Sequence, residues 1–321
     1  MLYKKGRCKM NFVDSLIGFA IGDAVGVPVE FTSRETLKVN PTTDMEEYGT
    51  HYQPKGTWSD DTSMTIATVY SMIEKNTIDY NDIMYKFREW MTNGKYTATD
   101  RCFDVGGTCS SAIYHFNGNN ACECGLKEIN SNGNGSLMRM LPIVYYCYYK
   151  KSNDNEIYNY VERLSSLTHG HAISVLGCYL YVKYMINLLN GMDKYDSFES
   201  LKNINLSFFD ENTLNVYNRI LKKDISKIKL RDIKSSGYIL DTLEAVLWTI
   251  LNTRNYKDSI LVSVNMGDDT DTVGAITGSI SGLIYGINSI PLEWLENLKK
   301  KDELLELSSI FERKLNEGEI K

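Results

Sequence analysis

The sequence has few prolines and few of the patterns that strands leave. Its 321 residues include only five prolines, and long alternations of apolar and polar residues are scarce. Apolar residues recur instead at helical spacing, as at Met64, Ala67 and Tyr70 and again from Val175 to Tyr184. These patterns predict an all-α protein.

The chain also lacks an excess of basic charge. Its net charge is -6 and its pI is about 5.4, so nothing attracts it in general to phosphate backbones or anionic lipid. The lysines at 299–301 and those scattered over 222–234 have acidic neighbours and are typical of solvated helix faces. The composition therefore favours neither a nucleic-acid nor a membrane partner.

Paired cysteines are missing as well. The seven cysteines are an odd number in a long chain, which argues against a complete disulfide framework and for a reducing compartment. The spacing of Cys102, Cys109, Cys122 and Cys124 is not that of two Cys-x-x-Cys knuckles, so zinc is not indicated. We therefore expect free thiols and a cytoplasmic protein.

No proline-rich or serine-rich linker divides the chain. We therefore expect a single domain over 1–321, with its core at about 11–290 and a peripheral, variable helical region at 190–235. The longest uncharged stretch, 272–292, is rich in Gly, Ser and Thr and follows an acidic cluster, which favours a buried helix over a membrane span. Glycine recurs every fourth position over 274–286, and this predicts a bare ridge for close packing against another helix.

Two segments place acids and hydroxyls directly before a helical pattern: WSDDTSM at 58–64 and VNMGDDTDTVG at 264–274. Capping explains part of this, with Ser59 or Asp60 opening one helix and Asp271 or Thr272 the other. Capping needs only one or two acids per helix, whereas adjacent carboxylates repel one another unless a cation neutralises them. The surplus acids therefore indicate a second role.

That role is metal binding. Carboxylates with hydroxyls, and without His or Cys beside them, form an oxygen set suited to Mg²⁺, Mn²⁺ or Ca²⁺ rather than zinc. If Asp60, Asp61, Asp269 and Asp271 converge, their four charges match two divalent ions. The pattern predicts a binuclear site with a metal-bound water as reactive or positioning group.

Six segments in order complete a resemblance to a known family. The chain resembles the ADP-ribosylglycohydrolases, of the dinitrogenase-reductase-activating glycohydrolase type, from about residue 11 to 286. The segments that carry the resemblance are GDAVGVPVEF from Gly22, GTWSDDTSM from Gly56, NGSLMR from Asn134, LTHGH from Leu167, SGYILDTLEAVLW from Ser236 and MGDDTDT from Met266.

The resemblance implies an all-α orthogonal helical bundle with a central binuclear metal cleft that holds two Mg²⁺ or Mn²⁺ ions. Carried over by position, the metal ligands fall into two sets. They are Ser59, Asp60 and Asp61, and Asp269, Asp271 and Thr272. Asp268 stands where relatives carry Gly or Asp, so it is placed outside the ligand set.

The same resemblance assigns catalytic roles to Glu30, Asp104 and Asp269. Glu30 matches a glutamate on a mobile flap over the metals, and Asp104 lies in a segment similar to the family's Asp-Ile-Gly segment, from which Gly107 and Cys109 depart. Asp104 is therefore a candidate base or an acid beside the ligands. For Asp23, a role in the site stands beside simple hydrogen bonding to backbone amides.

The ADP-ribose itself is expected on a glycine-rich segment. Residues 131–136 precede an apolar helical pattern, so their backbone amides are placed to converge on a diphosphate. With the resemblance, the expected contacts are Gly133, Asn134, Gly135, Ser136, His169 and Tyr238. For His169, a structural histidine is the alternative.

The expected function is metal-dependent hydrolysis that releases ADP-ribose from a modified acceptor, with protein arginine as the first expectation. Serine, poly-ADP-ribose, a nucleic-acid base and a small molecule remain open as acceptors. Two alternatives keep the fold without the reaction: a non-catalytic ADP-ribose-binding protein, and an immunity protein that neutralises an ADP-ribosyltransferase toxin. Turnover of an ADP-ribosylated acceptor separates the enzyme from a binder.

Overall fold

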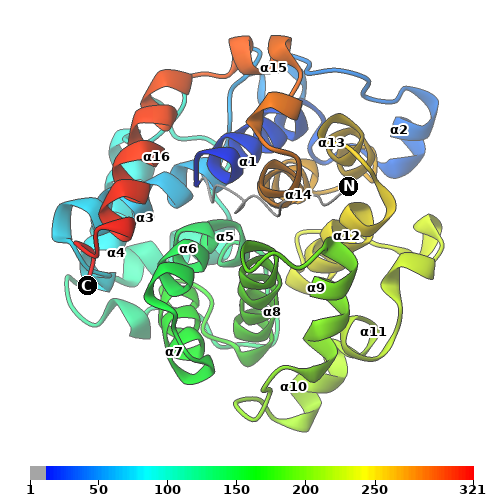
Figure 1. The fold of residues 1–321 in the computed structure, drawn as a ribbon. Helices are drawn as coiled ribbons and strands as arrows, with labels where there is room; N and C mark the ends of the chain where they lie inside the picture. The colour runs from blue at the N-terminus through cyan, green and yellow to red at the C-terminus, as the bar shows by residue number, and fades with distance from the viewer. Residues whose placement is uncertain (1–11) are drawn as a thin grey trace, which may run out of the picture.

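The structure, a computed structural model, describes residues 12–321. Over these residues the chain forms α-helices and short 3₁₀ turns, and its only extended pairings are three isolated bridges. The all-α prediction is therefore confirmed. In chain order (Figure 1) the helices are α1 (Phe12–Gly26), α2 (Arg34–Val39), α3 (Asp60–Lys75), α4 (Tyr80–Asn93), α5 (Gly107–His115), α6 (Leu141–Lys150), α7 (Asp154–Ser165), α8 (Ala172–Leu189), α9 (Lys194–Ser200), α10 (Glu211–Val216), α11 (Asn218–Lys222), α12 (Ile239–Asn252), α13 (Tyr256–Val264), α14 (Thr270–Tyr285), α15 (Leu292–Asn297) and α16 (Lys301–Asn316).

Helices α1 and α14 pack against each other near the middle of the molecule (Figure 1). A Cβ atom on Gly22 would lie 2.1 Å from the carbonyl oxygen of Gly274, and one on Gly278 would lie 2.1 Å from that of Gly18. The glycine ridge of α14 therefore contacts backbone directly, as its spacing predicts. Its partner, α1, carries glycine at the same four-residue spacing.

The last helix, α16, packs against the first helix, α1, in the hydrophobic core. The ring of Phe12 in α1 lies 4.8 Å from that of Phe311 in α16 and 5.0 Å from that of Tyr145 in α6, measured between centroids. Helix α16 also packs along α3 (Figure 1). Helix α1 is thereby held between α14 on one side and α16 on the other.

The segment 190–235 carries the short helices α9, α10 and α11 at the edge of the molecule, away from the α1–α14 pair (Figure 1). Lys194 Nζ donates to the carbonyl oxygen of Ile250 at 2.7 Å, which ties α9 to α12. Aromatic stacking continues there, with the rings of Tyr158 and Phe208 4.4 Å apart. The end of this segment reaches the second acidic cluster, because the Ser235 carbonyl oxygen accepts a bond from the Asp269 N–H at 3.0 Å.

The thiol and membrane expectations can be compared with the fold. The six cysteines between residues 12 and 321 are all free, as the sequence predicts. Two stretches are long and apolar enough to cross a bilayer by length and composition, Phe12–Val29 and Ala172–Leu189, and 83% and 78% of them are buried inside the molecule. Such burial is that of core helices in a soluble protein, so the two stretches are weak evidence for a membrane span.

Candidate active site

The first acidic cluster forms the beginning of α3. Ser59 is the N-cap residue, and its hydroxyl accepts a weak bond from the backbone N–H of Asp61 at 3.4 Å. Asp60 and Asp61 occupy the first helical turn, where the helix dipole favours negative charge. Of the two capping alternatives in the sequence, the structure selects Ser59.

Asp23 anchors this helix start to α1. Its carboxylate accepts bonds from the Ser59 N–H at 2.8 Å, the Thr62 N–H at 3.1 Å and the Thr62 hydroxyl at 2.6 Å. Burial raises the pKa of Asp23 to about 7, while these bonds act in the opposite direction. Asp23 therefore holds backbone amides, which is the second alternative that its sequence context offered, and it fixes the position of Asp60 and Asp61.

The second cluster forms the beginning of α14. The helix starts at Thr270 with Asp269 as N-cap residue, slightly earlier than the sequence predicts. Asp269 makes no side-chain capping bond, because its Oδ2 atom instead accepts a bond from the Asn134 side-chain amide at 2.8 Å. Its backbone N–H donates to the Ser235 carbonyl oxygen at 3.0 Å. Asp269 thus joins three distant segments.

The two helix beginnings meet in space. The Thr272 hydroxyl donates to Asp61 Oδ2 at 3.2 Å, which joins positions 211 residues apart in the chain. Two groups of three carboxylates have oxygens within 4.8 Å of one another. They are Asp60, Asp104 and Asp271, and Glu30, Asp269 and Asp271. The α1–α14 packing makes this convergence possible, because it fixes the start of α14 beside the end of α1 and hence beside Asp23 and α3.

The cluster holds more negative charge than the protein neutralises. Burial first, and neighbouring carboxylates second, raise the pKa values of Asp60, Asp61 and Asp271 well above the usual range. Within residues 12–321 no lysine or arginine forms an ion pair with them. Asp61 Oδ1 and Asp271 Oδ2 are buried without any hydrogen-bond donor. Buried carboxylate oxygens without donors, in an all-oxygen set, fit a divalent cation.

Glu30 reaches the cluster from the short 3₁₀ turn that follows α1. Its carboxylate is hydrogen-bonded to His51, and its carbonyl oxygen accepts a bond from the Thr50 hydroxyl at 2.6 Å. Burial raises the pKa of Glu30 to about 7, with further increases from Asp104 and Asp269. The hydrogen bond to Glu30 raises the pKa of His51. His51 has no local sequence signal, and sequence reasoning missed it.

Asp104 approaches from the loop before α5. Its backbone has φ of 51°, a left-handed conformation that non-glycine residues adopt mainly at constrained positions. Burial raises its pKa, while hydrogen bonding to Asp60 and Asp271 acts in the opposite direction. Asp104 thus lies beside carboxylates of both α3 and α14.

The predicted ADP-ribose segment runs behind Asp269. Gly133 forms an isolated antiparallel bridge with Tyr238, and the Asn134 N–H donates to the Gly237 carbonyl oxygen at 3.0 Å. The Ser136 hydroxyl is fully buried against the sulfur of Cys178, at 3.3 Å. A 3₁₀ turn over Leu137–Arg139 separates the segment from α6. The segment therefore precedes a helical stretch, as expected, and that stretch begins with the 3₁₀ turn.

His169 packs against this segment. A Cβ atom on Gly135 would lie 3.0 Å from His169 Cε1, so only glycine fits there without movement. Thr168 Oγ1 accepts a bond from Arg139 at 2.8 Å and lies 2.7 Å from His169 Nδ1. Burial, with a smaller effect of Arg139, lowers the pKa of His169 to about 3. The imidazole is therefore neutral near pH 7 and supports the backbone of residues 133–135.

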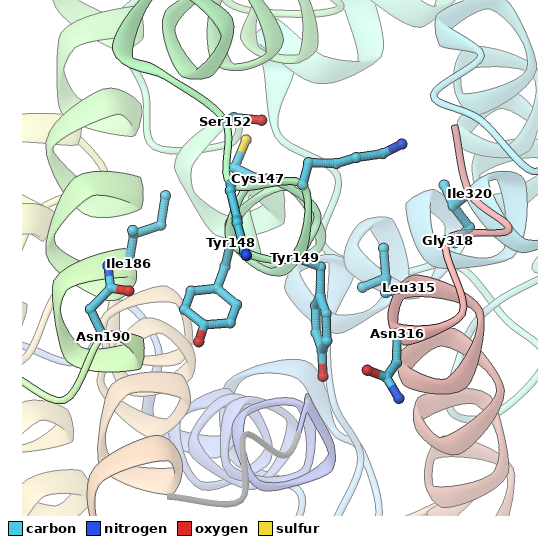
Figure 2. Close-up of a pocket in the computed structure, with 12 residues that line it drawn as sticks. Cys147, Tyr148, Tyr149, Ser152, Ile186, Asn190, Leu315, Asn316, Gly318 and Ile320 are labelled. Carbon is cyan, nitrogen blue, oxygen red and sulfur yellow. The ribbon is translucent and has the colours of Figure 1, made fainter. Parts of the chain in front are cut away.

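Two cavities of the molecule lie away from the acidic cluster. One of about 750 Å³ opens between the end of α6, α8 and the end of α16, where Tyr148, Tyr149 and Leu315 point into it (Figure 2). Another of about 600 Å³ borders His115 and Glu128. Neither cavity is lined by a carboxylate of the acidic cluster. The candidate active site is therefore identified from its side chains and not from the size of a cavity.

The buried carboxylates at these two abutting helix starts form an oxygen set suited to the divalent metal ions that many hydrolytic enzymes use. A family model described as ADP-ribosylglycohydrolase matches residues 7–319. The chain therefore belongs to the ADP-ribosylglycohydrolase family and is a hydrolase of glycosidic bonds.

Individual relatives agree with this assignment. The chain is 32% identical over 296 residues to the ADP-ribosylarginine hydrolase Tri1 of Serratia proteamaculans (strain 568), covering 92% of this chain and 76% of the relative. It is 28% identical to the ADP-ribosyl-[dinitrogen reductase] glycohydrolase of Rhodospirillum rubrum, covering 90% of each. A solved structure titled ADP-ribosylglycohydrolase-related protein complex superposes with a TM-score of 0.80 at 24% identity, over 96% of this chain and 99% of that one, and shows the same fold.

Proposed function

We propose that this protein hydrolyses the bond between ADP-ribose and an arginine side chain of a modified protein. The observation that carries the proposal is the convergence of two carboxylate sets at the starts of α3 and α14. The choice of arginine rests on the similarity to relatives named ADP-ribosylarginine hydrolase, at 32% identity in each of two bacteria.

Two Mg²⁺ or Mn²⁺ ions are the proposed cofactors. The proposed ligands are Ser59, Asp60, Asp61, Asp269, Asp271 and Thr272. Support comes from the donor-free oxygens of Asp61 and Asp271, since each would gain a partner from a cation. Bound divalent ions of this kind orient sugar hydroxyls and lower the pKa of a bound water.

The reaction needs groups that move protons at the anomeric carbon. Water adds to that carbon, the bond to the acceptor nitrogen breaks, and one proton passes from the water to the departing nitrogen. Glu30 is hydrogen-bonded to His51 and lies with Asp269 and Asp271 in one carboxylate group, which places it where a proton can be accepted and returned. We propose Glu30 and Asp104 as the proton-transferring carboxylates, with Asp269 contributing both to catalysis and to metal binding.

The ADP-ribose is proposed to lie on the segment behind Asp269, against Gly133, Asn134, Gly135, Ser136, His169 and Tyr238. The bond from Asn134 to Asp269 supports this location, because it connects the segment directly to the acidic cluster. The buried Ser136 side chain contacts Cys178, so Ser136 would contribute its backbone rather than its hydroxyl. His169 would act by supporting that backbone.

The proposed partner is an ADP-ribosylated protein, with an ADP-ribosylated small molecule as the smaller alternative, in the cytoplasm. A cognate ADP-ribosyltransferase or toxin is the further partner proposed. The whole chain is proposed to act as one domain, because α16 and α1 share one core.

A turnover assay tests the function. Metal-stripped protein is incubated with a protein ADP-ribosylated on arginine, with and without MgCl₂ or MnCl₂, and free ADP-ribose is measured. We expect metal-dependent release that Asp269→Ala abolishes and Asp268→Ala retains, because the exposed Asp268 bonds its neighbours through its backbone. Binding of ADP-ribose without release from any acceptor would instead support the non-catalytic alternative.

A further inference from the structure

Three exposed aromatic side chains lie on the two short segments that meet at Glu30: Phe31 follows Glu30 in the chain, and Tyr48 and Tyr52 flank the turn Gly49–His51. The exposed fractions of Phe31, Tyr48 and Tyr52 are 68%, 45% and 80%. Single exposed apolar side chains are common on soluble proteins, but a group of them beside a functional centre marks a contact surface. We call Phe31, Tyr48 and Tyr52 the aromatic rim.

Ring contacts connect the rim to the catalytic carboxylates. The ring of Phe31 lies 6.0 Å from that of His51, and His51 lies 5.3 Å from Phe103, the residue before Asp104. His51 is also hydrogen-bonded to Glu30. One edge of the rim therefore borders the proposed proton-transferring groups, and its other edge is open to solvent.

The two tyrosines flank the turn that is bonded to Glu30. Their rings lie 5.1 Å apart, on a turn pressed so tightly against the segment before Glu30 that a Cβ atom on Gly49 would lie 1.8 Å from the Pro28 carbonyl oxygen. The bond from the Thr50 hydroxyl to the Glu30 carbonyl oxygen holds the turn in place.

The backbone is strained at the three residues that carry these rings. Phe31, Tyr48 and Tyr52 have φ of 62°, 64° and 54°, a left-handed region that bulky residues rarely adopt because it is sterically strained. Glycine would adopt these turns at lower cost, and exposed rings gain little from packing. The aromatic side chains are therefore better explained by something they contact than by the turns themselves.

The negative charge around the rim favours a positively charged ligand. Glu30 and Asp104 lie at its inner edge, and the exposed Glu46 and Glu47 precede Tyr48 in the chain. Aromatic faces beside carboxylates are the surroundings in which a guanidinium group binds best, since it stacks on rings while donating to oxygens.

We propose that the aromatic rim is the acceptor-binding surface and that the guanidinium group of the modified arginine stacks on it, with Phe31 as the central ring. This inference rests on the proposed function and adds the residues that select the acceptor. It separates two halves of the substrate: the segment behind Asp269 holds ADP-ribose, and the rim holds the group that leaves.

The test uses ADP-ribosylagmatine, whose acceptor half is a guanidinium group without a peptide. We measure kcat and KM from release of ADP-ribose with bound Mg²⁺, and the Kd of free ADP-ribose by calorimetry. Phe31→Leu and Tyr52→Leu keep an apolar side chain but remove the ring. We expect each to raise KM about three- to tenfold, with the Kd for ADP-ribose within about twofold of wild type.

Two further variants make the result specific. Phe31→Trp keeps an aromatic face and should retain the wild-type KM, while Tyr114→Leu removes a ring that is 76% exposed on α5, outside the rim, and should change nothing. An unchanged KM in both rim variants overturns the proposal. Equal weakening of KM and of ADP-ribose binding also overturns it, because the rings would then hold the nucleotide.

Failure of the proposed function gives a different result. Wild-type protein that releases nothing from ADP-ribosylagmatine, but releases ADP-ribose from a serine-linked peptide, overturns the arginine assignment together with the guanidinium site. Wild-type turnover of ADP-ribosylagmatine with unaffected Leu variants leaves the function standing and overturns the rim alone.

Discussion

Among single residues, His169 has the surroundings that most restrict its chemistry. The Thr168 hydroxyl accepts a bond from Arg139 and so has its own hydrogen free for His169 Nδ1. When that hydrogen is donated to Nδ1, the neutral imidazole carries its own hydrogen on Nε2. Burial and the nearby Arg139 cation act in the same direction and hold the pKa of His169 at about 3.

We predict that this residue makes the fold sensitive to acid. The pKa of His169 is about 3 in the folded protein, and its ordinary value, which we take for the unfolded chain, is 6.5. Between these pH values His169 is protonated in the unfolded chain and neutral in the folded one. Stability is full above pH 6.5 and falls as the pH drops, by about 2 kcal/mol at pH 5 from this group. Urea unfolding of wild type and His169→Asn across pH 5–7 measures it.

The difference in unfolding free energy between these two proteins should shift by that amount across the window. His171→Asn is the matched control, because it also replaces an imidazole by an amide and retains an N-cap acceptor for α8. A difference between wild type and His169→Asn that stays constant with pH would show that His169 is not held neutral.

Sequence reasoning reached some of these residues and not others. The carboxylates Asp61 and Asp271 stand in a recognisable local pattern, so their positions could be predicted before the fold was known. His51 could not, because its partner Glu30 is 21 residues away and the contact depends on how the turn at 48–53 packs. A residue whose role comes from a long-range contact leaves no signal in its immediate neighbours.

At the scale of helices, the α1–α14 pair determines the site geometry. Gly26, at the end of α1, is so close to the start of α14 that a Cβ atom there would lie 2.4 Å from Asp271 Cα. The Thr270 hydroxyl donates to the Gly26 carbonyl oxygen at 2.8 Å. Since Asp23 on α1 also holds the start of α3, one helix aligns both acidic clusters.

We predict that Gly22→Ala unfolds the protein at markedly lower temperature. Its Cβ atom would lie 2.1 Å from the Gly274 carbonyl oxygen, and neither backbone can move without separating the helices. The expected loss is about 3 kcal/mol or more. Gly107→Ala near the start of α5, where a Cβ atom meets nothing within 4 Å, should stay within about 1 kcal/mol of wild type.

Thermal denaturation of both variants provides the measurement. If Gly22→Ala melts together with Gly107→Ala, the contact between α1 and α14 is looser than these distances imply. The ridge on α14 was predictable from its regular glycine spacing. Its partner was not identified from the sequence, although Gly18, Gly22 and Gly26 repeat the same spacing, because a ridge says only that some helix approaches.

Across the whole molecule, the folded state brings together charges that the unfolded chain keeps apart. Asp61 and Asp271 are 210 positions apart in the sequence and lie within one cluster in the fold. Their raised pKa values indicate that holding the two carboxylates together lowers the stability of the fold when no cation is present. The rest of the molecule compensates through a core that extends from α1 through α14 to α16.

We therefore predict that metal stabilises the chain as a whole. In calorimetry, the metal-stripped protein should melt in one transition, and its melting temperature should rise as MgCl₂ or MnCl₂ is added. The free energy of unfolding should increase by about 2.7 kcal/mol at a metal concentration a hundredfold above Kd. Asp61→Asn should melt at least about 2 °C higher than wild type when stripped, because a buried charge is gone. The melting temperature of Asp61→Asn should change little when metal is added.

Asp268→Asn is the control, since Asp268 is exposed and its bonds to Phe31 and Thr32 use only backbone atoms. It should reproduce the wild-type response to metal. Two separate transitions, of which only one moves with metal, would mean that α3 and α14 belong to independently folding parts. An undiminished metal response in Asp61→Asn would mean that the ions bind without the α3 carboxylate, and that the starts of the two helices do not share them.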